Sequence, residues 1–223
     1  MHKLLILKSY LSSLLQTASG QIERLGARRQ PLRIADLESL QQFLESRANH
    51  VTQTSLYGYL RTRAGTRYPE LFANDDFAKA INAAKWNIWL ACVSDLAIYT
   101  GGLLARKQRQ GGADAAGVMR TVVEQILRAD VPPEADQAYA GLRDEVRLRV
   151  DSCKWSEVAD SEAAFSASPD ALLRWAPIMD ALKQLDAEIV KNSVRFRWQE
   201  VRQELRQALD ADALLGMQGD SRG

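Results

Sequence analysis

Apolar residues recur at every third or fourth position along most of this chain, which is the spacing of helices that bury one face. One such repeat predicts a long helix over residues 36–60, which begins at the N-cap residue Asp36 and has its stop signal at Gly65. A second long helix is predicted over residues 76–106, after an Asn-Asp cap. Both repeats indicate helices that pack into the core of a domain.

The second half of the chain continues this pattern. Helices are predicted over residues 115–128 and 142–158, and a Ser-Pro-Asp sequence at residues 168–170 predicts a further helix start with its serine as N-cap. Pro177 either kinks that helix or begins the next one, which we expect to run to about residue 215. The apolar positions of this last helix are Leu182, Leu185, Ile189, Phe196, Leu205 and Leu209.

No segment has the alternation of a β-strand, so the sequence predicts an all-α fold, a helical bundle of about six to seven helices with a long C-terminal helix. We expect residues 1–20 to form an amphipathic helix, residues 21–215 a single helical domain and residues 216–223 a flexible tail. The charged, glycine-containing loop over residues 106–117 is a candidate boundary within that domain.

The segment over residues 1–20 has three interpretations. Its leucines share one helical face, which is typical of a helix docked on the core or on a partner. With the arginines that follow, the same helix would suit a membrane surface. The start also resembles a secretory signal, but Lys8 interrupts the apolar run after four residues, which is short for a cleaved signal.

Composition narrows the function classes. A chain with 46% hydrophobic and 26% charged residues and a net charge of +1 is neither disordered nor strongly basic, so we expect no nucleic acid. Cys92 and Cys153 lie in apolar patterns and indicate buried thiols in a reducing cytosol. With His50 as the only internal histidine, no metal site or cofactor is expected. Asp95, within the apolar residues 86–105, favours a core helix over a membrane span.

Candidate chemistry concentrates in residues 49–99, which hold half of the aromatic side chains. On the first long helix, Arg47, His50, Tyr57 and Arg61 follow one another along a polar flank. This flank either lines a cleft, where His50 would be a general base and the arginines would hold an anion, or it faces solvent and neighbouring helices.

A basic segment surrounds the predicted helix stop at Gly65. Arg61, Arg63 and Arg67 place three guanidinium groups around a glycine turn, which suits a bound phosphate or carboxylate. The same residues also suit a helix end without a ligand, because cations complement the helix dipole there.

A catalytic alternative uses Asp95 to orient His50, with Ser94 or Ser55 as the nucleophile of a hydrolase. The G-x-S-x-G elbow of α/β hydrolases does not occur in the chain. Buried polar residues in helical bundles more commonly form structural pairs.

One block combines several short motifs: Gln53-x-x-Leu56-Tyr57-Gly58-Tyr59, Thr62-Arg63-x-Gly65-Thr66-x-Tyr68-Pro69-x-x-Phe72, Asp76-x-Ala78, Lys85-Trp86 and Ser94-Asp95-Leu96. Over about residues 45–100 this pattern resembles a family of uncharacterised proteobacterial helical proteins, some of whose members are labelled "esterase". The resemblance implies a bacterial cytoplasmic protein. The label would imply a hydrolase, but the chain has no motif for that chemistry, so no catalytic residue follows from it.

The sequence thus predicts a non-enzymatic cytoplasmic adaptor or assembly-type protein that acts through helix-mediated contacts with a protein partner or a second copy. The alternatives are a small-molecule hydrolase and an anion-binding module, both using the face over residues 47–68. Contact with the inner membrane, if made, would involve residues 1–20.

Overall fold

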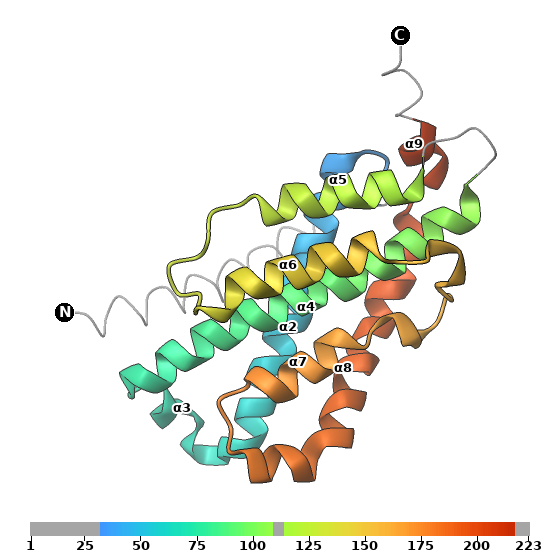
Figure 1. Ribbon diagram of the computed structural model, residues 1–223. Helices are drawn as coiled ribbons and strands as arrows, with labels where there is room; N and C mark the ends of the chain where they lie inside the picture. Colours follow the sequence, from blue (N-terminus) through green and yellow to red (C-terminus); the bar gives the residue numbers. More distant parts are fainter. Residues whose placement is uncertain (1–31, 109–113, 217–223) are drawn as a thin grey trace, which may run out of the picture. The chain divides into compact units, whose positions relative to one another are not determined.

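The computed structural model describes residues 32–108 and 114–216. These residues form helices without a β-strand, which confirms the predicted all-α bundle (Figure 1). The described residues from Arg33 onward group as one compact unit. The predicted helix over residues 1–20 and residues 217–223 of the predicted tail lie outside the described residues, whereas Gly216, the first residue of that tail, ends a short helix.

Long helices form the bundle, and shorter helices and single 3-10 turns connect them. In chain order the elements are α2 (Leu37–Ala64), η2 (Gly65–Arg67), α3 (Tyr68–Leu71), α4 (Asp75–Lys107), α5 (Ala115–Leu127), α6 (Ala138–Asp151), η3 (Trp155–Glu157), η4 (Glu162–Ala164), α7 (Ala167–Trp175), α8 (Asp180–Ala208) and α9 (Ala211–Gly216).

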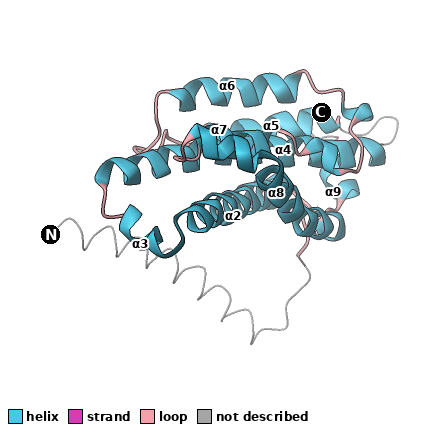
Figure 2. Cartoon of the chain, turned by 90° about the horizontal axis from the view of Figure 1, so that it is seen from below, coloured by secondary structure: helices cyan, strands magenta, loops and turns pink. Residues whose placement is uncertain are grey.

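Helix α4 runs through the centre of the bundle and packs against α2, α5, α6 and α7 (Figure 1). In Figure 2, α6 lies on one side of α4, while α2 and α8 lie on the other side. By length and composition α4 could cross a membrane, but 78% of its most apolar window is buried inside the bundle. Helix α4 is therefore the core helix that its sequence predicts.

Local signals set the ends of the first two long helices. Asp36 Oδ1 accepts the backbone N–H of Ser39 at 2.7 Å, and Ser39 Oγ accepts that of Asp36 at 3.2 Å, so the predicted N-cap is confirmed. Gly65 follows the last residue of α2 with a φ of 55°, which glycine adopts without strain. Asn74 caps α4 by accepting two backbone N–H groups of the first turn.

The predicted helix over residues 142–158 ends earlier than expected. Helix α6 stops at Asp151, and the chain then turns through η3 and packs on α4. The approach is close, because a Cβ atom added at Gly101 would lie 2.1 Å from the Trp155 ring. The fold of residues 152–158 is thus set by contact with α4 rather than by helical periodicity.

The predicted helix start at residues 168–170 is wrong by two positions. Helix α7 begins at Ala167, and its N-cap Ser166 makes no side-chain capping bond. Ser168 lies inside the first turn, where both its N–H and its hydroxyl donate to the buried carboxylate of Asp95. Pro177 lies in the connection between α7 and α8. A tertiary partner therefore overrides the local capping signal.

The last predicted helix is interrupted, so the expectation of one helix to residue 215 is also wrong. Helix α8 ends at Ala208, and α9 begins at Ala211. Between them, the backbone of Ile34 donates to the Ala208 carbonyl at 2.8 Å and accepts the Asp210 N–H at 2.9 Å. Asp210 then accepts the backbone N–H of Ala213 in α9 at 3.0 Å. A pairing with the distant Ile34 therefore breaks the helix.

Candidate functional site

The structure separates the residues of the predicted hydrolase relay. His50 is exposed on α2, whereas Asp95 lies in α4 with 0% of its surface exposed. The carboxylate of Asp95 is engaged by donors from α6 and α7 instead. Asp95 therefore does not orient His50, and the predicted hydrolase relay through these two residues is wrong.

Asp95 is the centre of a buried hydrogen-bond network. Its Oδ1 accepts Arg149 Nη1 at 2.7 Å and the backbone N–H of Ala167 at 3.1 Å. Its Oδ2 accepts the N–H of Ser168 at 2.7 Å and the Ser168 hydroxyl at 2.6 Å. Trp198 Nε1 donates to that hydroxyl oxygen at 3.0 Å. Burial raises the pKa of Asp95, and the Arg149 guanidinium opposes this rise. The network joins four helices, which is a structural role.

Ser94 lies next to this network but lacks a base. Ser94 and Arg149 both line a cavity of about 190 Å³ between α4, α6 and α7. The Ser94 hydroxyl oxygen accepts Arg149 Nη1 at 2.9 Å. A guanidinium stays protonated and cannot accept the serine proton. Within the described residues, no histidine or carboxylate is hydrogen-bonded to Ser94, so the geometry does not support it as a nucleophile.

The polar flank of α2 does not line a single cleft. Arg47 faces α8, where its Nε donates to Glu204 at 2.5 Å. His50 is exposed, and Tyr57 is partly buried and packs against the core. These three side chains, predicted as one site, therefore have separate surroundings.

The basic segment at the end of α2 forms ion pairs instead of an open anion site. Arg63 donates to both oxygens of Asp186 in α8, and Arg67 Nε donates to Glu70 at 3.1 Å. Arg61 is exposed. Two of the three predicted anion ligands are therefore already paired with carboxylates of this chain.

A larger cleft opens between α2 and α8, with a volume of about 400 Å³. At one end, Asp186 accepts the Tyr59 hydroxyl at 2.8 Å and is also held by Arg63. Burial, together with the carboxylate, raises the pKa of Tyr59 to about 12, so the phenol stays protonated. Hydrogen bonds from Arg63 lower the pKa of Asp186. Arg197, also on α8, lines this cleft.

Helix α8 carries apolar residues on two faces. The inner face holds the buried residues Val190, Val194, Trp198, Val201 and Leu205. The outer face carries what we call the α8 stripe: the apolar residues Leu182, Leu185, Ile189 and Phe196, together with the polar residues Asn192 and Gln199. Leu185, Ile189 and Phe196 are 79%, 75% and 71% exposed. These three residues belong to the predicted apolar pattern of the helix, but in the structure they are exposed instead of buried.

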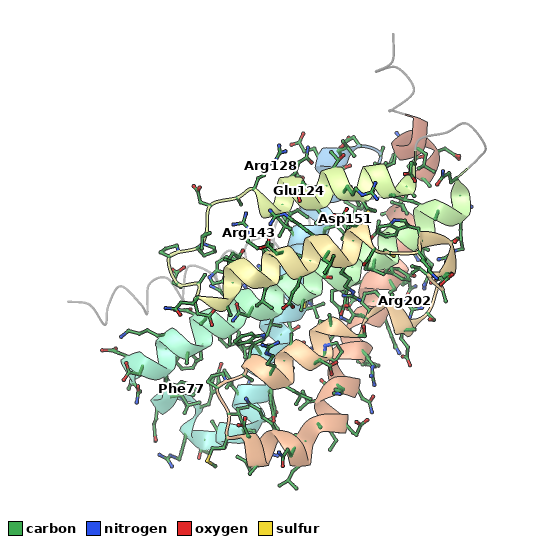
Figure 3. All side chains as sticks on the ribbon, viewed as in Figure 1. Phe77, Glu124, Arg128, Arg143, Asp151 and Arg202 are labelled. Atoms are coloured by element: carbon green, nitrogen blue, oxygen red, sulfur yellow. The ribbon has the colours of Figure 1, made fainter. Side chains whose placement is uncertain are left out.

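The C-terminal half of α8 is held firmly against the bundle. Arg202, labelled in Figure 3, donates to the backbone carbonyl of Asp160 at 3.2 Å and lies over the Tyr99 ring. Arg206 Nη1 donates to the Asp160 carboxylate at 3.1 Å. The hydrogen bond from Tyr99 lowers the pKa of Asp160, and Arg206 acts in the same direction. These contacts attach the C-terminal end of α8 to the bundle, beyond Gln199 at the end of the α8 stripe.

Two residues of α8 at this cleft, Asp186 and Arg197, were not predicted from the sequence as site residues. Asp186 lies 123 residues from Arg63, and no local motif indicates that pair. Arg197 is one of several basic residues of the last predicted helix, a pattern that does not indicate the cleft. Packing of α8 against α2 brings these residues together with Arg63. Ser55 lies at a core position of the predicted helix over residues 36–60. This position indicates that the serine is buried, but it does not indicate which residues surround it.

The described residues contain no group of three or more His, Cys, Asp and Glu side chains that could hold a metal ion. Cys92 is buried, and burial raises the pKa of its thiol to about 12. Burial therefore disfavours the thiolate, which is the nucleophilic form of cysteine.

Comparisons with models of known protein families, with curated proteins and with solved structures find no match. The resemblance over residues 45–100 stays a prediction. The function of this chain is therefore argued from its own geometry.

Proposed function

We propose that this protein is a non-enzymatic assembly protein that works through helix-mediated contacts, in which α8 of one copy pairs with α8 of a second copy. The observation that carries the proposal is the α8 stripe. Leu185, Ile189 and Phe196 are exposed to water although they lie in one line on a regular helix. Exposed apolar residues in such a line are typical of interaction surfaces.

The spacing of the stripe supports a helical partner. Its six residues follow one another at intervals of three and four, which is the a and d pattern of a coiled coil. Burying one Leu, Ile or Phe side chain stabilises a contact by about 1.5–3 kcal/mol. A second helix with the same stripe would cover all three exposed residues at once.

Charge at the edge of the stripe supports a second copy in antiparallel orientation. Glu188 and Arg195 lie on the same flank, seven residues and thus two turns apart. In a two-fold symmetric antiparallel pair, Glu188 of each copy lies opposite Arg195 of the other, which gives two attractive pairs. The apolar layers in this register pair Leu185 with Phe196.

We place this assembly in a bacterial cytoplasm. Cys92 and Cys153 are free thiols, which suits a reducing compartment. Contact with the inner membrane through residues 1–20 stays the alternative, and those residues lie outside the described ones.

The proposal is tested by the mass of the protein in solution. Sedimentation equilibrium over a concentration series should give twice the 24.9 kDa mass of one chain for the wild type. Leu185→Lys and Phe196→Lys should shift the equilibrium to the single chain, because each places a charge in the apolar layer.

Leu148→Lys is the matched control, since Leu148 is 68% exposed on α6 and lies outside the stripe. Circular dichroism checks that all three variants stay helical. A wild type with the mass of one chain throughout the series, or equal dissociation in the Leu148 variant, would overturn the proposal.

A further inference from the structure

The cleft between α2 and α8 has the dimensions of a small-molecule site. Its volume of about 400 Å³ falls in the range of ligand pockets, and Leu172 from α7 closes its apolar side. Ile189 and Val190 of α8 extend this apolar wall. Arg197, Ser55 and Leu172 line the cleft and lie outside the α8 stripe, so the inference does not rest on the proposed function; Ile189 is shared by the cleft and the stripe.

Arg197 is the charged group of the cleft that lacks a partner. Within the described part of the chain, Arg197 has no ion pair, and its Nε is buried without a hydrogen bond. Arg47 and Arg63, which also link α2 to α8, each have a carboxylate partner. An unpaired guanidinium beside a cleft is a ready donor for an oxyanion.

Gly58 of α2 lies beside this guanidinium. A Cβ atom added at Gly58 would lie 3.4 Å from Arg197 Nη2, so the guanidinium of α8 reaches the backbone of α2 at this point. A Cβ atom alone would make only an ordinary contact there, but a side chain of the size of leucine would extend into the space beside Arg197.

Ser55 adds a second polar group without a partner. It is 5% exposed, lines the cleft, and its hydroxyl has no hydrogen bond within the described residues. Buried hydroxyl groups in folded proteins are usually hydrogen-bonded, so an unsatisfied one in a cleft wall indicates a missing acceptor or donor. The other end of the cleft is already satisfied by the Tyr59, Asp186 and Arg63 contacts.

The charges of the cleft favour an anion. Arg63 and Arg197 carry two positive charges, and Asp186 carries one negative charge, which leaves an excess of one positive charge. We propose that the cleft binds a small organic anion, whose carboxylate or phosphate group pairs with Arg197 and contacts Ser55, and whose apolar part lies against Leu172 and its neighbours.

Binding is measured by isothermal titration with benzoate, phenyl phosphate and inorganic phosphate, at constant ionic strength with chloride as the reference anion. Wild type should bind benzoate, phenyl phosphate or both. Binding of benzoate alone assigns a carboxylate ligand, and binding of phenyl phosphate alone assigns a phosphate ester. Inorganic phosphate should bind more weakly, because it cannot use the apolar wall.

Arg197→Gln should weaken binding by about tenfold or more, because the charge-assisted pair is lost. Arg128→Gln removes the same charge from an exposed position on the distant end of α5 and should leave binding unchanged. Gly58→Leu keeps every charge, fills the cleft and should also abolish binding. Absence of binding by wild type, or equal binding by Arg197→Gln and Arg128→Gln, would overturn the proposal.

Discussion

In the middle of the bundle, the carboxylate of Asp95 accepts a hydrogen bond from Arg149. At its edge, the carboxylate of Asp186 accepts hydrogen bonds from Arg63. In both pairs, an acidic residue of one helix binds a basic residue of another, so these charges stabilise the arrangement of helices. Arg197 shares a cleft with Asp186 but has no such partner within the described residues. This contrast between paired and unpaired arginines is the reason for assigning a ligand to Arg197.

The Arg63–Asp186 pair makes part of the stability depend on pH. Hydrogen bonds from Arg63 hold the pKa of Asp186 below its ordinary value of 3.8. The stabilisation is therefore fully present above about pH 4 and is lost as the pH falls through the lowered pKa. We expect Asp186→Asn to lower the melting temperature at pH 7, and the gap to wild type to close in acid.

The control for this prediction is Asp130→Asn, because Asp130 is exposed in the connection between α5 and α6 and has no ion pair within the described residues. Melting temperatures by circular dichroism, taken between neutral pH and strong acid, give the comparison. A gap between Asp186→Asn and wild type that stays constant over this range would contradict the assignment.

Single-residue predictions from sequence succeeded where the partner is local. Asp36, Asn74 and Gly65 act within one turn of their own helix, so their roles follow from the sequence alone. Ser168 has the same capping signal but binds Asp95, and Arg63 binds Asp186. Their partners are distant in sequence, and no local pattern encodes them.

At the scale of elements, Gly101 sets how closely η3 approaches α4. A Cβ atom at this position would lie 2.1 Å from the Trp155 ring. Although alanine favours a helix over glycine by about 1 kcal/mol, overpacking costs about 1–3 kcal/mol and should dominate. We expect Gly101→Ala to lower the free energy of unfolding, as measured by urea denaturation.

Gly141→Ala is the matched control in α6. A Cβ atom there meets no other atom within 4 Å, so only the helix preference acts. This variant should be as stable as wild type or more stable by up to about 1 kcal/mol. If both alanine variants change stability equally, the close packing of η3 on α4 is not the reason for the glycine.

Element boundaries follow from sequence only as far as the helices are locally specified. The long helices α2 and α4 match their apolar repeats closely. The break after Ala208 does not follow from periodicity, because it depends on backbone pairing with Ile34. Tertiary contacts thus decide where the chain leaves a helix that its local sequence would continue.

At the scale of the whole molecule, the bundle follows from composition and periodicity, but the outward face of α8 does not. Val194 and Trp198 on one side and Ile189 and Phe196 on the other are all apolar, and only one face can meet the core. Which face remains outside depends on how α7 and α2 pack, so the sequence predicts a long helix without predicting its contact surface.

The stripe and the cleft lie on adjacent faces of α8. Ile189 belongs to the α8 stripe and also lines the cleft with Arg197. Binding of an anion and pairing of two copies would therefore involve the same helix, and each can be measured separately with Arg197→Gln and Leu185→Lys.

A charge exchange across the α8 contact tests the central proposal most directly. In the antiparallel pair, Glu188 of one copy faces Arg195 of the other, so Glu188→Arg and Arg195→Glu should each weaken the dimer through like-charge repulsion. The double variant should restore it. Sedimentation equilibrium that shows recovery of the dimer in the double variant supports the account, and equal masses for wild type and all three variants would contradict it.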